Sequence, residues 1–246
     1  MLGRSSKFAC LCVGVWAAVA CSGNTGPAGP KLSGNWHGYV SLHDEYGVNL
    51  TDNSGITVTA LPTTTNSTSS TAGLYTLNNL MTGVYTLSYS GTGYGTFLRP
   101  QVAFVGGGDQ LIGTTTLGKG STATIVNLAV ATAPDHLTIT GTVSAPPTGL
   151  QRTIRLFYGS ANTVTAVPPG YLLSTSFRSS VADFTLRVSG LDLQNIRSIV
   201  ASGSTAYVVA YGDGFDANSY TDSTSGQVIY PNVSSTASNV VSFTVP

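Results

Sequence analysis

The sequence predicts an all-β protein built from two tandem β-sandwich domains, and three observations support this fold class. Only 8% of the 246 residues are charged, and Glu45 is the only glutamate, so helices would lack their usual residues for a solvated face. Thr, Val and Tyr are abundant, and these residues fit a pleated, half-buried surface. Short apolar runs alternate with clusters of Gly, Asn, Asp, Pro and Ser, which is the spacing typical of a sandwich.

Charge excludes one class of partner. The chain has ten basic and ten acidic residues and a formal net charge of zero. Nucleic-acid binding needs a basic stripe that displaces counterions from phosphates, whereas the Lys and Arg residues here are scattered. We therefore predict no nucleic-acid partner.

The N-terminus, residues 1–20, is predicted to be a signal peptide. Arg4 and Lys7 precede the apolar run Phe8–Ala20. A run of thirteen residues is shorter than the roughly twenty that span a bilayer, but it has the length of a signal-peptide core. The following string, Ala18-Val19-Ala20-Cys21, resembles a bacterial lipobox, with Ala18 where Leu is usual. The resemblance implies cleavage before Cys21 and lipidation of that cysteine.

The cysteine count agrees with lipidation. Cys10 and Cys12 lie in the apolar run, so cleavage would leave Cys21 as the single cysteine. A single unpaired thiol in a secreted protein needs a partner or a modification, and lipidation would provide the modification. The alternative to lipidation is ordinary Ala-x-Ala cleavage, which would leave a free thiol. Several acyl chains anchor a protein stably, so we expect a lipid anchor in the cell envelope. Ser22 follows Cys21, which by resemblance to enterobacterial sorting favours the outer membrane, on either its periplasmic or its surface face.

Residues 21–34 are predicted to be the lipidated cysteine and a flexible tether, because Gly and Pro interrupt any regular element there. The first sandwich is predicted over residues 35–132. Its expected strands are Trp36–Leu42, Ile56–Leu61, Leu74–Leu77, Val84–Ser90, Phe97–Val105, Gln110–Leu117 and Thr122–Ala131. The Gly106-Gly107-Gly108-Asp109 run is expected to be a hairpin turn.

A motif in this region carries a family resemblance. Residues 73–87 follow the pattern G-x-Y-x-L-x-x-L-x-x-G-x-Y-x-L, and Gly93-Tyr94 comes after it. The pattern is similar to that of carboxypeptidase regulatory-like domains, which implies a prealbumin-like, seven-stranded sandwich that contributes no catalytic residues. Gly73 and Gly83 are expected at turns with positive φ. The expected core residues are Tyr75, Leu77, Leu80, Tyr85 and Leu87.

The second sandwich is predicted over residues 133–246 and resembles an immunoglobulin-like domain. Alternation places Phe184, Leu186 and Val188 on one inward face. Residues Leu191–Ala201 are expected to form a short helix or a turn. The expected strands are His136–Val143, Thr153–Tyr158, Tyr171–Phe177, Phe184–Ser189, Thr205–Gly212 and Val240–Val245.

Two clusters are candidate metal sites. Asp213, Asp216, Asn218 and Asp222 place oxygen ligands on one loop, as calcium requires, although turn chemistry explains the same residues. His37 and His43 share a strand face near Asp44 and Glu45 but would lie roughly 20 Å apart, too far to share an ion. We therefore expect both histidines to be partly solvated loop residues, and we predict no cofactor.

Four tyrosines near predicted loops, Tyr94, Tyr171, Tyr220 and Tyr230, are candidate ligand contacts. Loop aromatics can stack on sugars or on a protein partner, and edge packing within a sandwich is the alternative.

The sequence contains no Gly-x-Ser-x-Gly elbow, and nothing in the spacing of the carboxylates singles out a pair for glycoside hydrolysis. The leading hypothesis is a non-enzymatic structural or interaction module, attached to the membrane by its lipid and binding an envelope protein or a glycan. A carbohydrate-binding surface lipoprotein is the alternative, and a hydrolase with an unfamiliar site is the third hypothesis.

Overall fold

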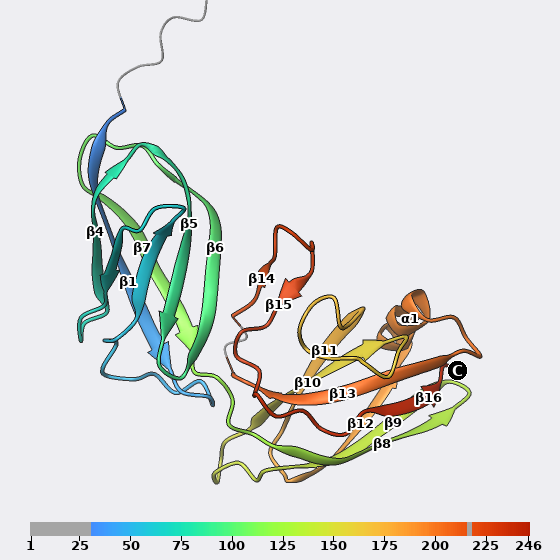
Figure 1. The fold of residues 1–246 in the computed structure, drawn as a ribbon. Helices are drawn as coiled ribbons and strands as arrows, with labels where there is room; N and C mark the ends of the chain where they lie inside the picture. Colours follow the sequence, from blue (N-terminus) through green and yellow to red (C-terminus); the bar gives the residue numbers. More distant parts are fainter. Residues whose placement is uncertain (1–30, 216–217) are drawn as a thin grey trace, which may run out of the picture. The chain divides into compact units, whose positions relative to one another are not determined.

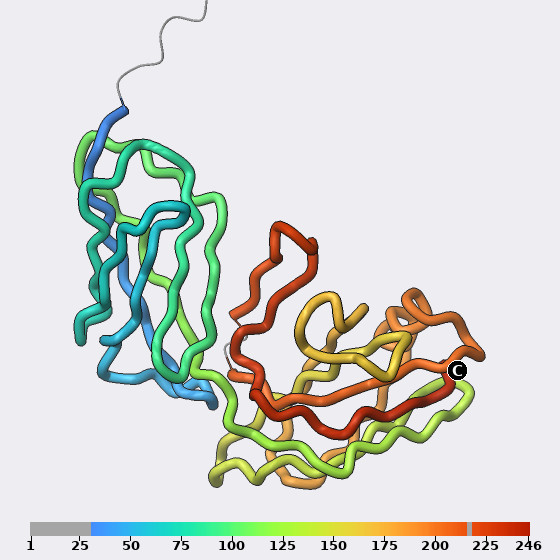
Figure 2. Tube along the Cα trace, viewed as in Figure 1, coloured from blue at the N-terminus to red at the C-terminus, as the bar shows by residue number. Residues whose placement is uncertain are grey.

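The computed structural model describes residues 31–215 and 218–246, and in these ranges the chain is all-β with one short helix (Figure 1). Figure 2 traces the path of the chain through the same elements. The predicted fold class is confirmed. Cys21 and Asp216 lie outside the described residues. Within the described ranges, no helix has the length and apolar character needed to cross a membrane.

The first sandwich has two sheets with the strand orders β4-β1-β7 and β3-β2-β5-β6. Its strands are β1 (Ser33–His43), β2 (Thr57–Leu61), β3 (Asn66–Thr68), β4 (Leu74–Met81), β5 (Gly83–Gly91), β6 (Tyr94–Phe104) and β7 (Gln110–Gly118). β1 pairs in parallel with β7, and the other pairs are antiparallel. These seven strands agree with the number that the family resemblance implies.

The core of the first sandwich forms where the inward side chains of the two sheets meet. The five expected core residues, Tyr75, Leu77, Leu80, Tyr85 and Leu87, are all buried. They pack with residues of both sheets in one cluster. Burial alternates along β5, since inward positions come every second residue in a strand.

Two boundaries differ from the prediction. β1 begins at Ser33, because Ser33 pairs with Met81 on β4, so the last two residues of the expected tether belong to the sheet. The expected strand 122–131 is β8 (Ile125–Ala133), which pairs with β9 (His136–Val143) of the second sandwich. The chain therefore changes sandwich within residues 119–124 rather than at 132. In the first sandwich, β3 was not predicted from the sequence.

The second sandwich contains three strands, β12-β9-β8, opposite four, β11-β10-β13-β16, an immunoglobulin-like arrangement. The remaining elements are β10 (Arg152–Gly159), β11 (Leu173–Ser179), β12 (Asp183–Ser189), α1 (Gly190–Ile199), β13 (Thr205–Asp213), β14 (Tyr220–Thr221), β15 (Val228–Ile229) and β16 (Val241–Thr244). The short helix is confirmed, and Phe184 and Val188 are buried, with Leu186 packed beside them. The β14–β15 hairpin was not predicted.

Glycine positions refine the turn predictions. Gly73 has a φ of +82°, as expected, whereas Gly83 is not among the positive-φ glycines and instead begins β5. The run Gly106–Gly108 has positive φ throughout, but it connects β6 to β7, which belong to different sheets. It is therefore a crossover between sheets, and the expected hairpin is wrong.

Candidate functional site

Strand β10 is buried on both of its faces, and this explains where the candidate site forms. One face, including Leu156, packs into the main core of the second sandwich. The other face, including Phe157, packs into a separate cluster with Val209 of β13. Residues from two long connections, 160–172 and 214–240, complete this second cluster and so cover the outer face of the sheet.

Two of the four candidate tyrosines, Tyr171 and Tyr230, meet on this face. The ring centroid of Phe157 lies 4.9 Å from that of Tyr171 and 5.8 Å from that of Tyr230, both in edge contacts. The two tyrosine centroids lie 6.3 Å apart. Burial, together with the neighbouring Tyr230, raises the pKa of Tyr171 to about 12, so this phenol is neutral at physiological pH.

Hydrogen bonds fix both phenols. The Tyr171 hydroxyl donates to the Val228 carbonyl oxygen. The Ser174 hydroxyl donates to the Tyr230 hydroxyl oxygen over 2.7 Å. The rings are therefore held in position by β11 and the β15 region before any ligand binds.

A buried ion pair lies against Tyr230. Arg155 Nε donates to Asp213 Oδ2 over 2.6 Å, and the two side chains are only 7% and 0% exposed. The Arg155 guanidinium carbon lies 3.8 Å from the centre of the Tyr230 ring, a cation–π contact. Burial raises the pKa of Asp213, and the Arg155 charge opposes that shift.

A cleft of about 310 Å³, here called the tyrosine cleft, opens between β11 and the β14–β15 hairpin. Its lining residues are Tyr171, Leu172, Leu173, Ser174, Gly226, Gln227, Val228 and Tyr230. Gln227 Nε2 donates to the Tyr171 carbonyl oxygen over 3.1 Å. Gln227 Oε1 is buried and has no hydrogen-bond partner among the described residues. The cleft thus combines aromatic rings with an amide side chain whose buried oxygen lacks a donor.

The other two candidate tyrosines do not join this cleft. Tyr94 is half-buried against the core of the first sandwich, and burial raises its pKa, with a further contribution from Asp44. Tyr220 lies on β14, with its ring centroid 6.3 Å from that of Phe97 in an edge contact. For these two residues the structure shows packing contacts.

The described calcium candidates have separate partners. Asp213 pairs with Arg155, and Asn218 Oδ1 accepts a hydrogen bond from the Gly118 amide over 2.8 Å. Asp222 Oδ2 accepts from the Ser225 amide over 2.7 Å, which is turn chemistry. Asp216 lies outside the described residues. In the part of the chain that the structure describes, no group of three or more His, Cys, Asp or Glu is placed to hold a metal ion.

The two histidines lie on β1, so their expected placement in a loop is wrong. The His37 Nδ1 and Thr76 Oγ1 atoms are 2.9 Å apart and hydrogen-bonded. Its Nε2 lies 3.3 Å from Asp109 Oδ2. His37 is therefore occupied by neighbouring strand and turn residues, and His43 is half-buried at the end of the same strand.

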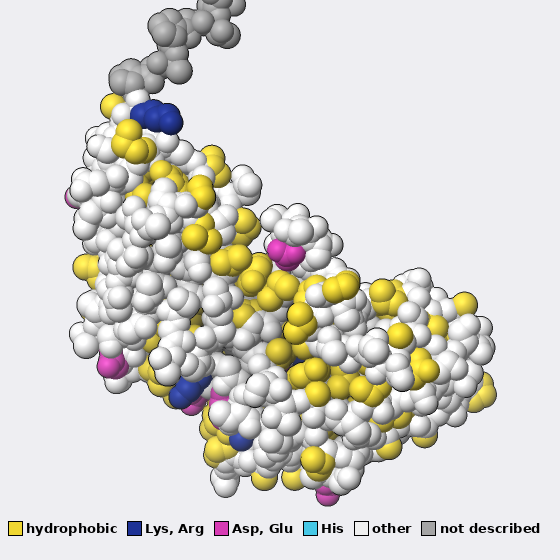
Figure 3. Space-filling model, viewed as in Figure 1, with side chains coloured by type: hydrophobic (Ala, Val, Ile, Leu, Met, Phe, Trp, Pro, Cys, Tyr) yellow, Lys and Arg dark blue, Asp and Glu magenta, His cyan; other side chains and the backbone are white. Residues whose placement is uncertain are grey.

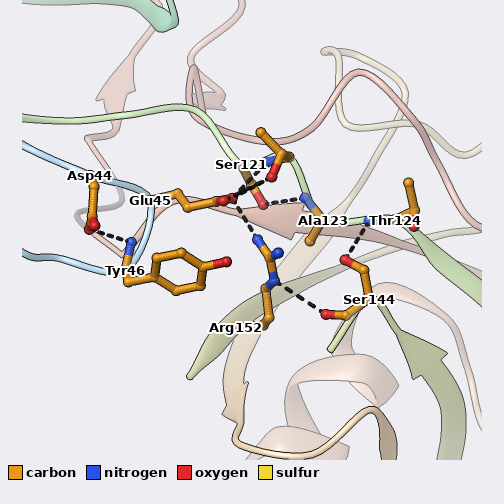
Figure 4. Close-up of polar contacts among 9 residues, drawn as sticks. Asp44, Glu45, Tyr46, Ser121, Ala123, Thr124, Ser144 and Arg152 are labelled. Carbon is orange, nitrogen blue, oxygen red and sulfur yellow. Dashed lines mark hydrogen bonds and ion pairs between the residues drawn. The ribbon is translucent and has the colours of Figure 1, made fainter. Parts of the chain in front are cut away.

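Glu45 joins the two sandwiches (Figure 4). Its carboxylate accepts hydrogen bonds from the Thr122 amide over 2.7 Å and from the Thr122 hydroxyl over 2.8 Å. Arg152 Nη1 lies 2.7 Å from Glu45 Oε2, and the two side chains are 10% and 13% exposed, respectively. Arg152 Nε also donates to the Ser144 carbonyl oxygen over 3.3 Å. Figure 4 shows this chain of contacts from Glu45 through Arg152 to Ser144.

The electrostatics of this contact favour the ionised carboxylate. Burial alone would raise the pKa of Glu45, but the Thr122 hydrogen bonds and the Arg152 charge together lower it. Burial and the Glu45 carboxylate raise the pKa of Tyr46. Elsewhere charge is sparse, as the visible face in Figure 3 shows.

Two of the residues described above, Gln227 and Arg155, were not singled out from the sequence, and Asp213 was considered only as a calcium ligand. Gln227 lies in a predicted loop. Its Nε2 donates to the carbonyl oxygen of Tyr171, 56 positions away, while its Oε1 has no partner among the described residues. Arg155 and Asp213 lie on neighbouring strands, 58 positions apart. The position of Arg155 within the otherwise apolar run Ile154–Tyr158 was the only available signal.

Comparison with models of protein families finds no match, and comparison with curated protein sequences finds none either. Among solved structures, the chain is similar to a candidate carbohydrate-binding protein from Bacteroides uniformis, with 15% identity, a TM-score of 0.32, and coverage of 87% of this chain and 99% of that one. A DUF3823 family protein from Parabacteroides merdae shows 11% identity, a TM-score of 0.30, and coverage of 87% and 100%.

A chain of a type II cohesin–X-dockerin complex from Acetivibrio cellulolyticus shows 18% identity and a TM-score of 0.30. That alignment covers 35% of this chain and spans 58% of the other. With TM-scores near 0.3, these three likenesses carry no argument about function.

Proposed function

We propose that this protein is a non-enzymatic module of the cell envelope that binds neutral carbohydrate at the tyrosine cleft. The observation that carries the proposal is the unpartnered Gln227 Oε1 beside Tyr171 and Tyr230. A buried acceptor without a donor costs free energy, and a ligand hydroxyl would recover it once a small rotation of the Gln227 side chain exposes the oxygen to the cleft. Aromatic rings supply the apolar surface on which the C–H face of a sugar packs.

The charge distribution of the cleft supports a neutral ligand. No lining residue is charged, and the nearby Arg155 is neutralised by Asp213. A volume of about 310 Å³ is at the small end of the range for ligand sites, which run from roughly 300 to 1,000 Å³. The cleft therefore suits one end or a short segment of a glycan.

The buried carboxylates support binding without chemical conversion. Asp213 is paired with Arg155, and Glu45 is held ionised by Thr122 and Arg152. General acid catalysis of glycoside cleavage needs a carboxylic acid that keeps its proton near the operating pH and reaches the substrate. Glu45 has the opposite pKa shift, and Asp213 is enclosed.

Attachment through a lipid on Cys21, at the outer membrane, is also part of the proposal. The lipobox-like string and the following small-residue tether support it. The seven-stranded first sandwich supports a relationship to carboxypeptidase regulatory-like domains, in which this unit would be an accessory module. Mass spectrometry of the native protein would test the anchor: acylated Cys21 is expected, and an unmodified thiol would contradict it.

A glycan array probed with the mature chain tests carbohydrate binding. We expect the wild type to bind a neutral glycan, Gln227→Met to bind at least tenfold more weakly, and Gln194→Met, a matched change on the exposed face of α1, to bind normally. No binding by the wild type, with or without calcium, would overturn the proposal, as would unchanged binding by Gln227→Met. Pull-down of an envelope protein unaffected by Gln227→Met would favour the protein-interaction alternative.

A further inference from the structure

We infer that a second cleft, formed where the two sandwiches meet, binds another segment of neutral carbohydrate; this inference rests on the proposed function. The cleft has a volume of about 620 Å³, and we call it the joint cleft. Its lining residues are Tyr46, Pro146, Pro147, Thr148, Gly149, Leu150, Gln151, Ser180 and Phe215.

The lining of the joint cleft points to the class of ligand. It contains no charged residue, which disfavours a phosphate or a carboxylate ligand. Tyr46 and Phe215 provide aromatic surface, and the amide of Gln151 offers a donor and an acceptor. Thr148 and Ser180 add hydroxyls. Apolar rings combined with a few neutral hydrogen-bonding groups fit the two faces of a sugar, its C–H surface and its hydroxyls.

The aromatic rings are positioned before a ligand arrives. The Arg152 guanidinium carbon lies 4.8 Å from the centre of the Tyr46 ring. The Arg178 guanidinium carbon lies 3.8 Å from the centre of the Phe215 ring. Phe215 also packs on Gly47, where an added Cβ would lie 2.3 Å from the ring. Preorganised rings lose little conformational entropy on binding, which favours affinity.

The first sandwich contributes one wall of the joint cleft, and contacts between the sandwiches hold that wall in place. Tyr46 comes from the first sandwich, whereas Gln151 and Ser180 come from the second. The Glu45 backbone oxygen accepts a hydrogen bond from the Phe215 amide over 3.0 Å, and the Glu45 side chain pairs with Arg152. Glu45 is thus a positioning residue for both aromatic walls.

Two binding sites on one chain change how a polysaccharide binds. A polymer that reaches both clefts binds the second one intramolecularly, so its affinity exceeds that of either site alone. An oligosaccharide too short to reach both would occupy the clefts independently.

Isothermal titration of the mature chain with maltohexaose, cellohexaose and mannohexaose tests this inference. We expect two sugars bound per wild-type chain, one per Phe215→Leu chain, one per Gln227→Met chain and none for the double variant. Phe215→Leu keeps apolar volume against Gly47 but removes the ring, and thermal unfolding would verify that each variant folds. Tyr39→Leu, a matched exposed change on β1, should keep both sites.

The outcomes separate the two proposals. An unchanged stoichiometry in Phe215→Leu would overturn the joint cleft and leave the tyrosine cleft standing. A different outcome would be one sugar bound per wild-type chain. If Phe215→Leu then abolished that binding and Gln227→Met did not change it, the result would support the joint cleft and contradict the tyrosine cleft. Absence of binding by the wild type to all three sugars would contradict both.

Discussion

Individual charged residues matter unusually in this chain, because there are only ten basic and ten acidic ones. Two acidic residues, Glu45 and Asp213, are paired with arginines in largely buried positions. A buried ion pair adds little net stability over a well-packed apolar pair, but removing one partner leaves the other charge buried and unpaired. The structure therefore predicts asymmetric responses to substitution at both pairs.

Replacing Asp213 alone should strongly lower the free energy of unfolding. Asp213→Leu leaves Arg155 unpaired at 7% side-chain exposure, so we expect a loss of about 3–5 kcal/mol in the free energy of unfolding. The double variant Arg155→Met with Asp213→Leu should lose less than the single variant, since no buried charge is stranded. Urea titration of Asp213→Leu, Arg155→Met and the double variant measures these effects. A double variant whose loss equals the sum of the two single losses would contradict this account.

Glu45 should make stability depend on pH in the acidic range. Its folded-state pKa is lowered, so its stabilising contribution is complete above the ordinary value of 4.5 and is lost as the pH falls through the folded pKa. At pH 7, Glu45→Gln should cost about 1–3 kcal/mol. Unfolding measured from pH 7 to pH 3 should show the wild type and the variant converging below pH 4.5. A constant difference across that range would argue against the predicted linkage.

For single residues, the sequence identifies candidate side chains by their type, but it does not show which other residues they contact in the fold. Tyr171 and Tyr230 could be chosen as candidates because aromatics near loops are conspicuous. Their meeting on β10 depends on two long connections folding over one sheet face, which local pattern does not encode. Gln227 was missed for the same reason, since its exceptional property is an unfilled hydrogen bond rather than its identity.

Among the elements, strands with clear alternation were predicted well, and β9 was predicted with its observed bounds. The short strand β3 was missed because three polar residues, Asn66–Thr68, carry no apolar signal. β8 was recognised as a strand but assigned to the wrong sandwich. Alternation of apolar and polar residues identifies the buried face of a strand, but it does not show which sheet the strand joins. Here the pairing of β8 with β9 places β8 in the second sandwich.

The turn before β4 gives a prediction about an element. Gly73 and Gly203 share a φ of +82°, but only at Gly73 would an added Cβ meet backbone, 2.1 Å from the Val40 carbonyl oxygen. Gly203→Ala should cost about 1 kcal/mol from backbone strain. Gly73→Ala should cost about 2 kcal/mol more, from overpacking against β1. Equal free energies of unfolding for the two variants would show that the close approach is unimportant.

For the whole molecule, the two tandem sandwiches could be predicted from strand spacing, whereas the contact between them could not. Glu45 contacts Thr122 and Arg152, which lie 77 and 107 positions further along the chain. The conspicuous feature of the sequence was that Glu45 is the only glutamate, and the structure places it at the junction. A division into separately folding domains stays a prediction.

The proposed function depends on the tyrosine cleft receiving a sugar and leaving it intact. The most direct measurement is a crystal structure of the mature chain soaked with the hexasaccharide that binds best in titration. We predict sugar density against Tyr230, a sugar hydroxyl within hydrogen-bond distance of Gln227 Oε1, and unbroken glycosidic bonds. An empty tyrosine cleft in a crystal that holds the sugar elsewhere, or a cleaved sugar in the cleft, would contradict the account.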